Sequence, residues 1–352
     1  MPLNSIFGII PPQGYPLRNS ISINIINSQS IATPAPFQTL LTFTPSLYVY
    51  GLRNDLGNIR FFDANFNLLF AWLESGGTGL SSNIWVNLPN GIPANSSITI
   101  YMVALPDFIT FDGYYWGEAP QLSPTYGQYD NGANVFLLYF NGNTPLSNFN
   151  SEGNTLTQAS ATGPTGSIIN VISITGYASN FGFVYTAKSL SNQPIIAESS
   201  SQQNGLQAGG LSADNGQVSI VSGTSTSGLN AISVDMGFGS SYFTNNYFSG
   251  GTQTFGVNQQ GTANSNWHYA SVTYAGSSAT SWSGYIAPQL YSTAGGYSGS
   301  VSNNPLSSST SLYLGLIGTV SSSFQWQTYI NWMRARAYPP NGVMPSVSIG
   351  NP

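Results

Sequence analysis

Short segments in which apolar and polar residues alternate recur along most of the chain and predict β-strands. In residues 97–104 the alternation has a period of two, which is the side-chain period of a strand. Residues 59–62 lead through polar residues 63–65 into the apolar run 68–73, and this order predicts a hairpin with a short turn. Residues 83–88 form another such segment, ahead of a Pro-Asn-Gly turn.

The same pattern continues after residue 150 and indicates a second β-rich domain. Helices are disfavoured because 39 Gly and 21 Pro interrupt nearly every window of the sequence. Many short strands with Gly- and Asn-rich turns favour an all-β fold of two antiparallel, jelly-roll-like β-sandwich domains. The strands expected in the second domain are residues 167–175, 182–187, 218–221, 231–236, 267–274, 283–287, 312–317 and 328–338.

The best domain boundary is the polar stretch 141–157, which follows the apolar segment 135–140. We therefore expect the first sandwich at residues 31–147 and the second at residues 148–352. Residues 1–30 are expected to form an extended N-terminal arm, because X-Pro pairs near its start disfavour helix. Four apolar residues of this arm are candidates for docking onto a neighbouring subunit by strand addition: Ile6, Phe7, Ile9 and Ile10.

The chain has unusually few charges, with 11 Asp+Glu against 6 Lys+Arg, or 5% charged residues. A basic footprint for nucleic acid is missing, so a nucleic-acid partner is not expected. Acid unfolds proteins mainly by protonating carboxylates that are ionised in the native state. The small number of carboxylates in this chain therefore predicts that it tolerates an acidic medium. The alternative is that a Ser-, Thr- and Asn-rich surface reflects extracellular life at any pH.

Other classes of protein are excluded by what the sequence lacks. It has no Cys and one His, which removes disulfides, thiolate metal sites and cysteine nucleophiles. No run of 18 apolar residues predicts a membrane-spanning helix. The first twelve residues lack a cationic start and a long apolar run, so no secretion signal is expected. We expect no cofactor and no bound metal.

Three regions of the sequence carry a resemblance that covers both ends of the chain. They are the segments 32–38, 55–62, 72–76, 84–89 and 91–102 of the first region, then residues 117–136, and then residues 331–350. The sequence resembles a family of archaeal and bacterial surface proteins, in which a β-rich domain of unknown function precedes a concanavalin A-like, laminin-G-like lectin sandwich. The resemblance implies a surface or adhesive role. It departs from the family at residues 137–142, which lack the family's acidic junction, so an ion there is not expected.

A chain without a recognised export signal, yet composed for an acidic exterior, can reach that exterior inside a released virus particle. We therefore expect a non-enzymatic structural protein on the surface of an archaeal virion, such as a turret, spike or fibre component, in a hot, acidic medium. Its expected partners are copies of itself, other virion proteins and a host surface glycan. The alternatives are a cell-surface adhesin or filament subunit of an acid-living archaeon and, less favoured, a glycan hydrolase.

An aromatic loop with carboxylates is the first candidate binding site. It contains Asp112, Tyr114, Tyr115 and Trp116, between the further acids Asp107 and Glu118. Aromatic faces beside carboxylates can bind carbohydrate, whereas hydrolysis needs two acids about 5–10 Å apart in a cleft. A loop that is simply well packed is the leading alternative, and no catalytic residue is assigned.

A second candidate lies in the last long strand, where Trp332, Arg334 and Arg336 share one face. Stacking within this group, or pairing with Asp235 or Glu198, is favoured over contact with sugars or acidic groups of a partner.

Several smaller features have plain structural interpretations. His268 lies on an apolar strand face and is expected to be packed and hydrogen-bonded. Two Asp-Asn-Gly tripeptides, at residues 130–132 and 214–216, could offer oxygens to calcium but are more often simple turns. Asn95 begins an Asn-Ser-Ser sequon at a turn, from which a glycan could project.

Overall fold

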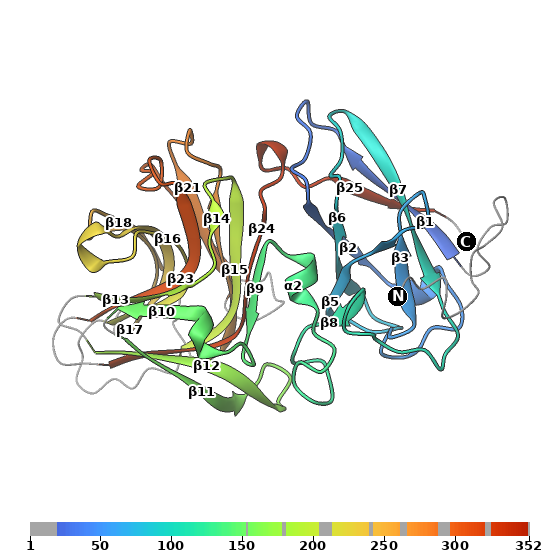
Figure 1. Ribbon diagram of the computed structural model, residues 1–352, viewed down its shortest axis with the longest axis horizontal. Helices are drawn as coiled ribbons and strands as arrows, with labels where there is room; N and C mark the ends of the chain where they lie inside the picture. The colour runs from blue at the N-terminus through green and yellow to red at the C-terminus, as the bar shows by residue number, and fades with distance from the viewer. Residues whose placement is uncertain are drawn as a thin grey trace. The chain divides into compact units, whose positions relative to one another are not determined.

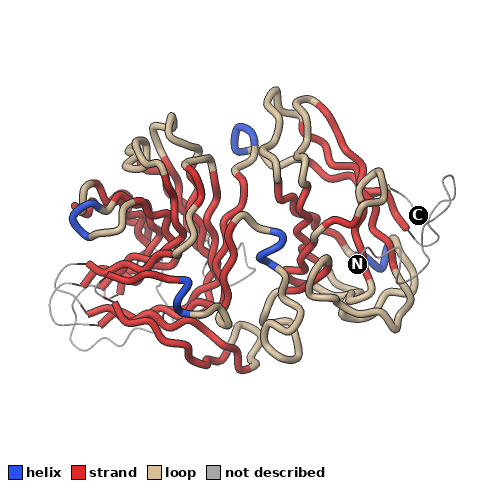
Figure 2. The backbone as a smooth tube through the Cα atoms, viewed as in Figure 1, coloured by secondary structure: helices blue, strands red, loops and turns tan. Residues whose placement is uncertain are grey.

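The computed structural model describes residues 20–152, 154–177, 181–203, 213–238, 242–260, 266–287, 296–320 and 325–350. Strands dominate these residues and helices are short, which confirms the all-β fold (Figure 2). The chain forms two compact units. Unit 1 comprises residues 1–119, 129–135 and 343–352, and unit 2 comprises residues 120–128 and 136–342.

Unit 1 contains two sheets. The five-stranded sheet has the order β25-β1-β7-β3-β4, and the four-stranded sheet has the order β2-β6-β5-β8 (Figure 1). Their strands are β1 (Ser20–Asn27), β2 (Phe37–Phe43), β3 (Ile59–Phe62), β4 (Leu68–Leu69), β5 (Ala71–Ser75), β6 (Ser82–Leu88), β7 (Ser96–Ala104), β8 (Trp116–Glu118) and β25 (Ser346–Ile349). The short helices of unit 1 are η1 (Pro45–Leu47) and α2 (Gly132–Val135).

The core of unit 1 lies between these sheets. Alternate residues of β1, namely Ile21, Ile23 and Ile25, are buried. The ring of Phe61 in β3 packs against Trp116 in β8, with ring centroids 5.6 Å apart. The hydrophobic alternation of β1 thus buries one of its faces, whereas β8 is buried on both, and this burial holds the two sheets together.

Both ends of the described chain meet in unit 1, and this pairing shortens the expected arm. Strand β1 lies between β25 and β7, so residues 20–27 are part of a sheet rather than of an extended arm. The reason is the alternation of isoleucines, which requires a core to cover it. The four arm residues Ile6, Phe7, Ile9 and Ile10 lie outside the described residues.

Unit 2 is a sandwich of two larger sheets. One has the order β10-β13-β23-β16-β17-β18-β19, with β14 beside β23, and the other has the order β11-β12-β24-β15-β20-β21-β22, with β9 beside β24 (Figure 1). Its core contains Ile220, Val234, Val272 and Met333, which come from both sheets. These residues belong to segments that the sequence predicted to be strands.

The elements of unit 2 follow in chain order. They are β9 (Leu138–Asn141), η2 (Leu146–Asn148), β10 (Phe149–Glu152), β11 (Asn154–Thr162), β12 (Ile168–Tyr177), β13 (Phe181–Thr186), β14 (Leu190–Ser191), β15 (Ile195–Gln203), β16 (Ala213–Ser222), η3 (Thr226–Gly228), β17 (Asn230–Phe238), β18 (Tyr242–Ser249), β19 (Thr252–Gln260), β20 (Trp267–Tyr274), β21 (Trp282–Ala287), β22 (Tyr297–Val301), β23 (Ser311–Val320), β24 (Gln325–Ala337) and η4 (Pro340–Gly342).

The structure differs from the sequence expectations in three ways. Strand β9 belongs to unit 2, whereas the sequence placed it in the first sandwich, and β25 returns to unit 1 from the other end of the chain. The expected strand at 135–140 begins only at Leu138, after helix α2. Strands β5 and β8 pair in parallel, an exception to the antiparallel pattern.

Within the described residues, no helix is long and apolar enough to cross a membrane.

Candidate functional site

Three aromatic rings of unit 1 form a group that we call the aromatic platform: Tyr114, which is exposed, and Phe70 and Tyr115, which are half-buried. The rings of Phe70 and Tyr115 stack with centroids 5.0 Å apart and an interplanar angle of 13°. The ring of Tyr114 meets both of them edge-on, at 5.4 Å and 4.9 Å. Tyr114 remains 54% exposed, so about half of this residue can still be covered by a ligand.

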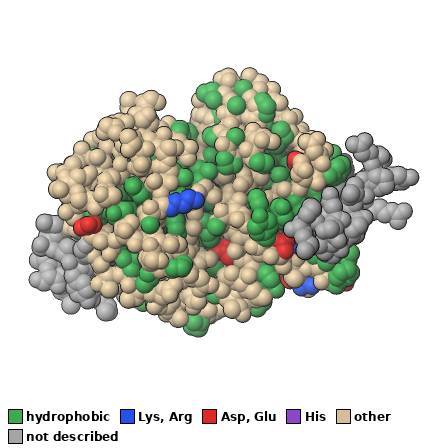
Figure 3. Space-filling model, in the orientation of Figure 1, with side chains coloured by type: hydrophobic (Ala, Val, Ile, Leu, Met, Phe, Trp, Pro, Cys, Tyr) green, Lys and Arg blue, Asp and Glu red, His purple; other side chains and the backbone are tan. Residues whose placement is uncertain are grey.

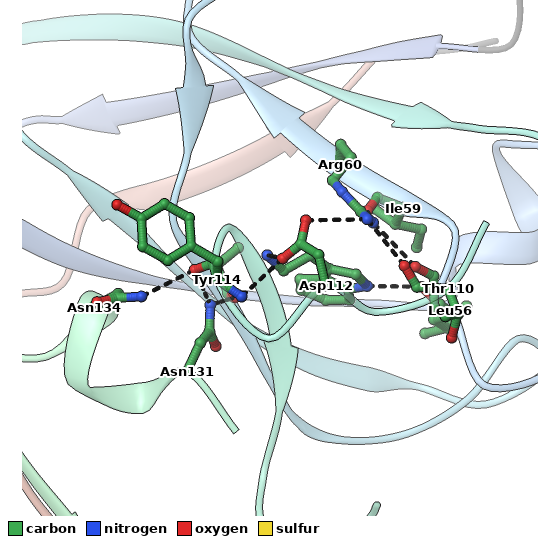
Figure 4. A network of polar contacts seen from close by, with 11 residues as sticks. Leu56, Ile59, Arg60, Thr110, Asp112, Tyr114, Asn131 and Asn134 are labelled. Carbon is green, nitrogen blue, oxygen red and sulfur yellow. Dashed lines mark hydrogen bonds and ion pairs between the residues drawn. The ribbon is translucent and has the colours of Figure 1, made fainter. Parts of the chain in front are cut away.

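The loop that carries Tyr114 is held by Asp112. One oxygen of this carboxylate accepts hydrogen bonds from the backbone N–H groups of Tyr114, at 2.8 Å, and Trp116, at 2.9 Å. The other oxygen lies 3.1 Å from the guanidinium of Arg60. Figure 4 shows the Tyr114 ring pointing away from this network while its backbone is tied into it. The platform ring therefore stands on a fixed loop.

Arg60 is buried beneath the loop and supports Asp112. Its guanidinium donates hydrogen bonds to the carbonyl oxygens of Gly57, Ile59 and Thr110, at 2.6–3.0 Å. Burial lowers the pKa of Arg60 from its ordinary value, and the charge of Asp112 opposes this change. Since a guanidinium stays protonated in proteins, Asp112 faces a permanent positive charge.

Two asparagines support the platform from the segment around α2. Asn131 and Asn134 both donate hydrogen bonds to the carbonyl oxygen of Tyr114, at 2.8 Å and 3.2 Å. The same Asn131 amide also donates to the carbonyl oxygen of Ala71. A Cβ at Gly117 would lie 2.3 Å from Asn131 Oδ1, so this close approach requires glycine.

Trp116 was expected to be a contact residue of this loop, but the structure places it in the core. Its side chain is fully buried, and its indole N–H donates to the carbonyl oxygen of Leu56 at 2.9 Å. Its ring stacks on Phe111 as well as packing against Phe61. The physical reason is that Trp116 begins β8 and points between the sheets, where its large apolar surface is removed from water.

The acids of this region lie in different environments. Glu118 is buried in β8, whereas Asp112 and Asp107 are exposed. The backbone carbonyl of Asp107 accepts a hydrogen bond from Arg53, which also pairs with Asp55 at 2.8 Å. Of the three acids, Asp112 is therefore the one that lies next to the platform and reaches solvent.

The candidate in the last long strand is an interior ion cluster of unit 2. Trp332 and Arg334 are fully buried, so the structure does not present them to a ligand. Glu198 lies 2.5 Å from Arg334 and 2.7 Å from Arg336, and it accepts a hydrogen bond from Tyr269. Strands β15 and β24 bring these residues together, with Glu198 opposite Arg334 in the register.

The cluster keeps Glu198 ionised. Burial would raise the pKa of Glu198, but attraction to Arg334 and Arg336 and the hydrogen bond from Tyr269 outweigh it and lower the pKa to about 2. The Arg334 guanidinium also lies 4.7 Å from the ring centres of Trp332 and Phe136. Pairing with Glu198 and stacking are thus what the structure shows for this strand.

The remaining candidates have simple placements. His268 is fully buried, and its Nδ1 lies 2.9 Å from the carbonyl oxygen of Ala287. Asp130 accepts hydrogen bonds from the Trp72 indole and from the backbone of its own turn. The side chain of Asp214 lies outside the described residues. Asn95 is exposed, just before β7 and with φ of 47°.

The chain has a relative in an archaeal virus. It is 53% identical over 343 residues to uncharacterized protein 562 of Sulfolobus islandicus rod-shaped virus 1. The match covers 97% of this chain and 59% of that protein, so the chain spans less than two thirds of its relative. No family model matches the chain, and the surface-protein family expected from its motifs therefore stays a prediction.

Solved structures of similar fold include glucanases and lectins. The β-glucanase of Bacillus licheniformis has a TM-score of 0.33 at 12% identity, covering 56% of this chain and 97% of its own. Arcelin-5, a lectin-like defence protein of Phaseolus vulgaris, has a TM-score of 0.34 at 9% identity, covering 54% and 99%. The expectation of a non-enzymatic protein is therefore wrong as a conclusion from sequence, because enzymes stand among the structures of similar fold.

Sequence reasoning missed two members of the site. Phe70 lies in the apolar run 68–73, which was expected to be one strand of a hairpin, although it forms half of the ring stack. Arg60 lies in the expected strand 59–62 and was not singled out, although it is the cation that holds Asp112. The scarcity of cations is a signal that could have singled out Arg60, since few partners exist for any exposed carboxylate in this chain.

Proposed function

We propose that this chain is an outward-facing component of an archaeal virion and that it binds host surface glycan through the aromatic platform. Two observations support the virion context, namely the homologue in an archaeal rod-shaped virus and the nearly uncharged surface. Figure 3 shows that uncharged side chains dominate the visible face. Copies of the chain and other virion proteins are the partners that this role requires.

The half-exposed Tyr114 ring beside Asp112 is the observation that carries glycan binding. A sugar ring has an apolar face of C–H groups, and burying that face on an aromatic ring removes both from water. Sugar hydroxyls can then donate hydrogen bonds to the exposed Asp112 carboxylate. Because Arg60 and two backbone N–H groups already hold this carboxylate, it is oriented before the ligand arrives.

Changing Tyr114 to Ala should weaken glycan binding at least tenfold, because the variant loses the exposed ring face. A tenfold loss corresponds to about 1.4 kcal/mol. The measurement is binding of purified protein to a glycan array, followed by titration of the strongest ligand. Tyr50→Ala is the matched control, since Tyr50 is 81% exposed and lies outside the platform.

Two results would go against this assignment. Equal binding by the Tyr114→Ala protein and the wild type would remove the platform from recognition. Release of reducing sugar by the wild type, abolished in Asp112→Asn, would instead assign hydrolysis to the same loop.

Two further assignments stay predictions under this proposal. The arm residues Ile6, Phe7, Ile9 and Ile10 lie outside the described residues, and their docking onto a neighbouring subunit is proposed from sequence alone. Asn95 is proposed as a glycan attachment site, since its side chain is exposed at a turn.

A further inference from the structure

The turn between β3 and β4 places a bulky aromatic residue in a backbone conformation that disfavours it. Phe66 has φ of 61°, in the left-handed region that large L-residues rarely adopt. Asn65 and Asn67 flank it, and asparagine tolerates this conformation better. The strained position is therefore occupied by Phe although residues better suited to it stand on both sides.

The side chain of Asp63 holds this turn closed. Its carboxylate accepts hydrogen bonds from the backbone N–H groups of Asn65, at 2.9 Å, and Asn67, at 2.8 Å. The side-chain amide of Asn67 donates to the other carboxylate oxygen at 2.9 Å. The strained Phe66 is thus kept in one place by three hydrogen bonds to a single side chain.

Phe66 gains little burial in return for this strain. Its side chain is 46% exposed, and its ring stacks on Tyr101 of β7 with centroids 5.6 Å apart and an interplanar angle of 15°. The pair therefore presents a flat aromatic surface to solvent. A residue selected only for stability at this turn would not combine unfavourable φ with exposed apolar surface.

Tyr101 lies on the outward face of the five-stranded sheet, beside uncharged polar residues of β1 and β7. In the register of the five-stranded sheet, Tyr101 lies opposite Ser22, and the next outward pair is Asn24 with Thr99. Ser348 of β25 lies opposite Asn24. These positions alternate with the buried isoleucines of β1, so they face outward, and Ser22 and Ser348 are exposed. Outward positions of β1, β7 and β25 include no charged residue, although they include two apolar ones, the half-buried Ile26 and the buried Val103. Arg60 of β3 lies opposite Val103, where it too is buried.

We infer that this face, with the Phe66–Tyr101 stack at one end, binds a neutral polysaccharide. The stack offers a surface for the C–H face of one sugar ring, and the rows of hydroxyl and amide groups offer partners for the hydroxyls of the next rings. Strands about 4.8 Å apart repeat these groups across the face. A protein partner fits less well, because the cores of protein interfaces are depleted in serine. The site is additional to the aromatic platform.

The experiment compares retention of the purified chain in gels that contain neutral mannan, neutral β-glucan or acidic alginate. Phe66→Asn should lose at least fivefold in affinity for a neutral polysaccharide, while its melting temperature equals or exceeds that of the wild type. Leu80→Asn is the control, because Leu80 is 64% exposed and lies outside this face. Binding should change little with salt, since no charges take part.

Several outcomes overturn the inference. Unchanged retention of Phe66→Asn would do so, and so would a melting temperature several degrees below the wild type, because Phe66 would then serve stability. Stronger retention by alginate would contradict a neutral ligand. The Tyr114→Ala protein separates the two sites, since loss of all retention in that variant would place the polysaccharide on the aromatic platform alone.

Discussion

At the scale of single residues, the chain concentrates two of its few cations around one buried carboxylate. Glu198 contacts Arg334 and Arg336 in the interior of unit 2, and its pKa of about 2 keeps it ionised in mildly acidic solution. A complete buried ion pair of this kind contributes little to the free energy of unfolding. Removing one partner is strongly destabilising, because the other charge then stays buried without a counter-charge. The cluster is therefore a sensitive point of a nearly uncharged protein.

Glu198→Gln should destabilise unit 2 by about 3–5 kcal/mol, because the buried guanidinium of Arg334 and the partly buried one of Arg336 lose their counter-charge. The folded pKa of about 2 lies below the ordinary value of 4.5, so the ionised group stabilises the fold above pH 4.5. This contribution is lost as the pH falls from 4.5 towards 2. Thermal unfolding across that range should therefore slope in the wild type and be flatter in the variant.

The exposed pair of Arg53 and Asp55 supplies the control for this measurement. Its side chains are 35% and 44% exposed, and Asp55→Asn should change stability by at most about 1 kcal/mol. If Glu198→Gln behaves like Asp55→Asn, the cluster does not carry the stability assigned to it.

The sequence predicted some of these residues and not others. The few acids in the second half of the chain left Asp235 and Glu198 as possible partners of the arginines, and the structure shows that the partner is Glu198. The three adjacent aromatics 114–116 gave no sign of which ring would face the core, because that depends on where β8 begins. The strain at Phe66 was also hidden, since a turn is visible in sequence while its φ angles are not.

At the scale of elements, alternation of apolar residues predicted most strands but not their neighbours. Strands β6 and β7 follow one another in the chain, and a turn with Gly91 at φ of 62° joins them, yet they belong to different sheets. Pairing of β1 with β25 joins segments more than 300 residues apart. Packing in three dimensions determines which strands pair, and the local period of apolar residues carries no information about it.

Removing β25 tests whether this distant pairing stabilises unit 1. Deletion of residues 343–352 should cost a few kcal/mol, because the hydrogen bonds from β25 to β1, about 1 kcal/mol each, are lost. The backbone N–H of Gly350 donates to the carbonyl oxygen of Ser22, so Ser22, Asn24 and Ile26 direct their backbone groups toward β25. Hydrogen exchange should therefore become faster at the amides of Asn24 and Ile26. Ser348→Ala, which keeps the backbone pairing, is the control. Unchanged exchange in the deletion variant would show that β25 does not support the sheet.

At the scale of the whole molecule, solubility comes from neutral polar side chains. With 11 acidic residues in 352, few carboxylates are available to be protonated, so we expect the loss of stability in acid to be concentrated in Glu198. Tolerance of a hot, acidic medium stays a prediction from this composition. The viral homologue gives such a surface a plausible setting, since a virion exterior meets the medium directly.

We propose that this chain faces outward on a virion. The most direct measurement is immunogold electron microscopy of intact particles purified from a culture that produces the chain, with particles opened by detergent as the control. The account predicts gold on the exterior of intact particles, at no lower density than on opened ones. Unlabelled particles, with the chain recovered instead from the cell envelope or cytosol, would contradict it.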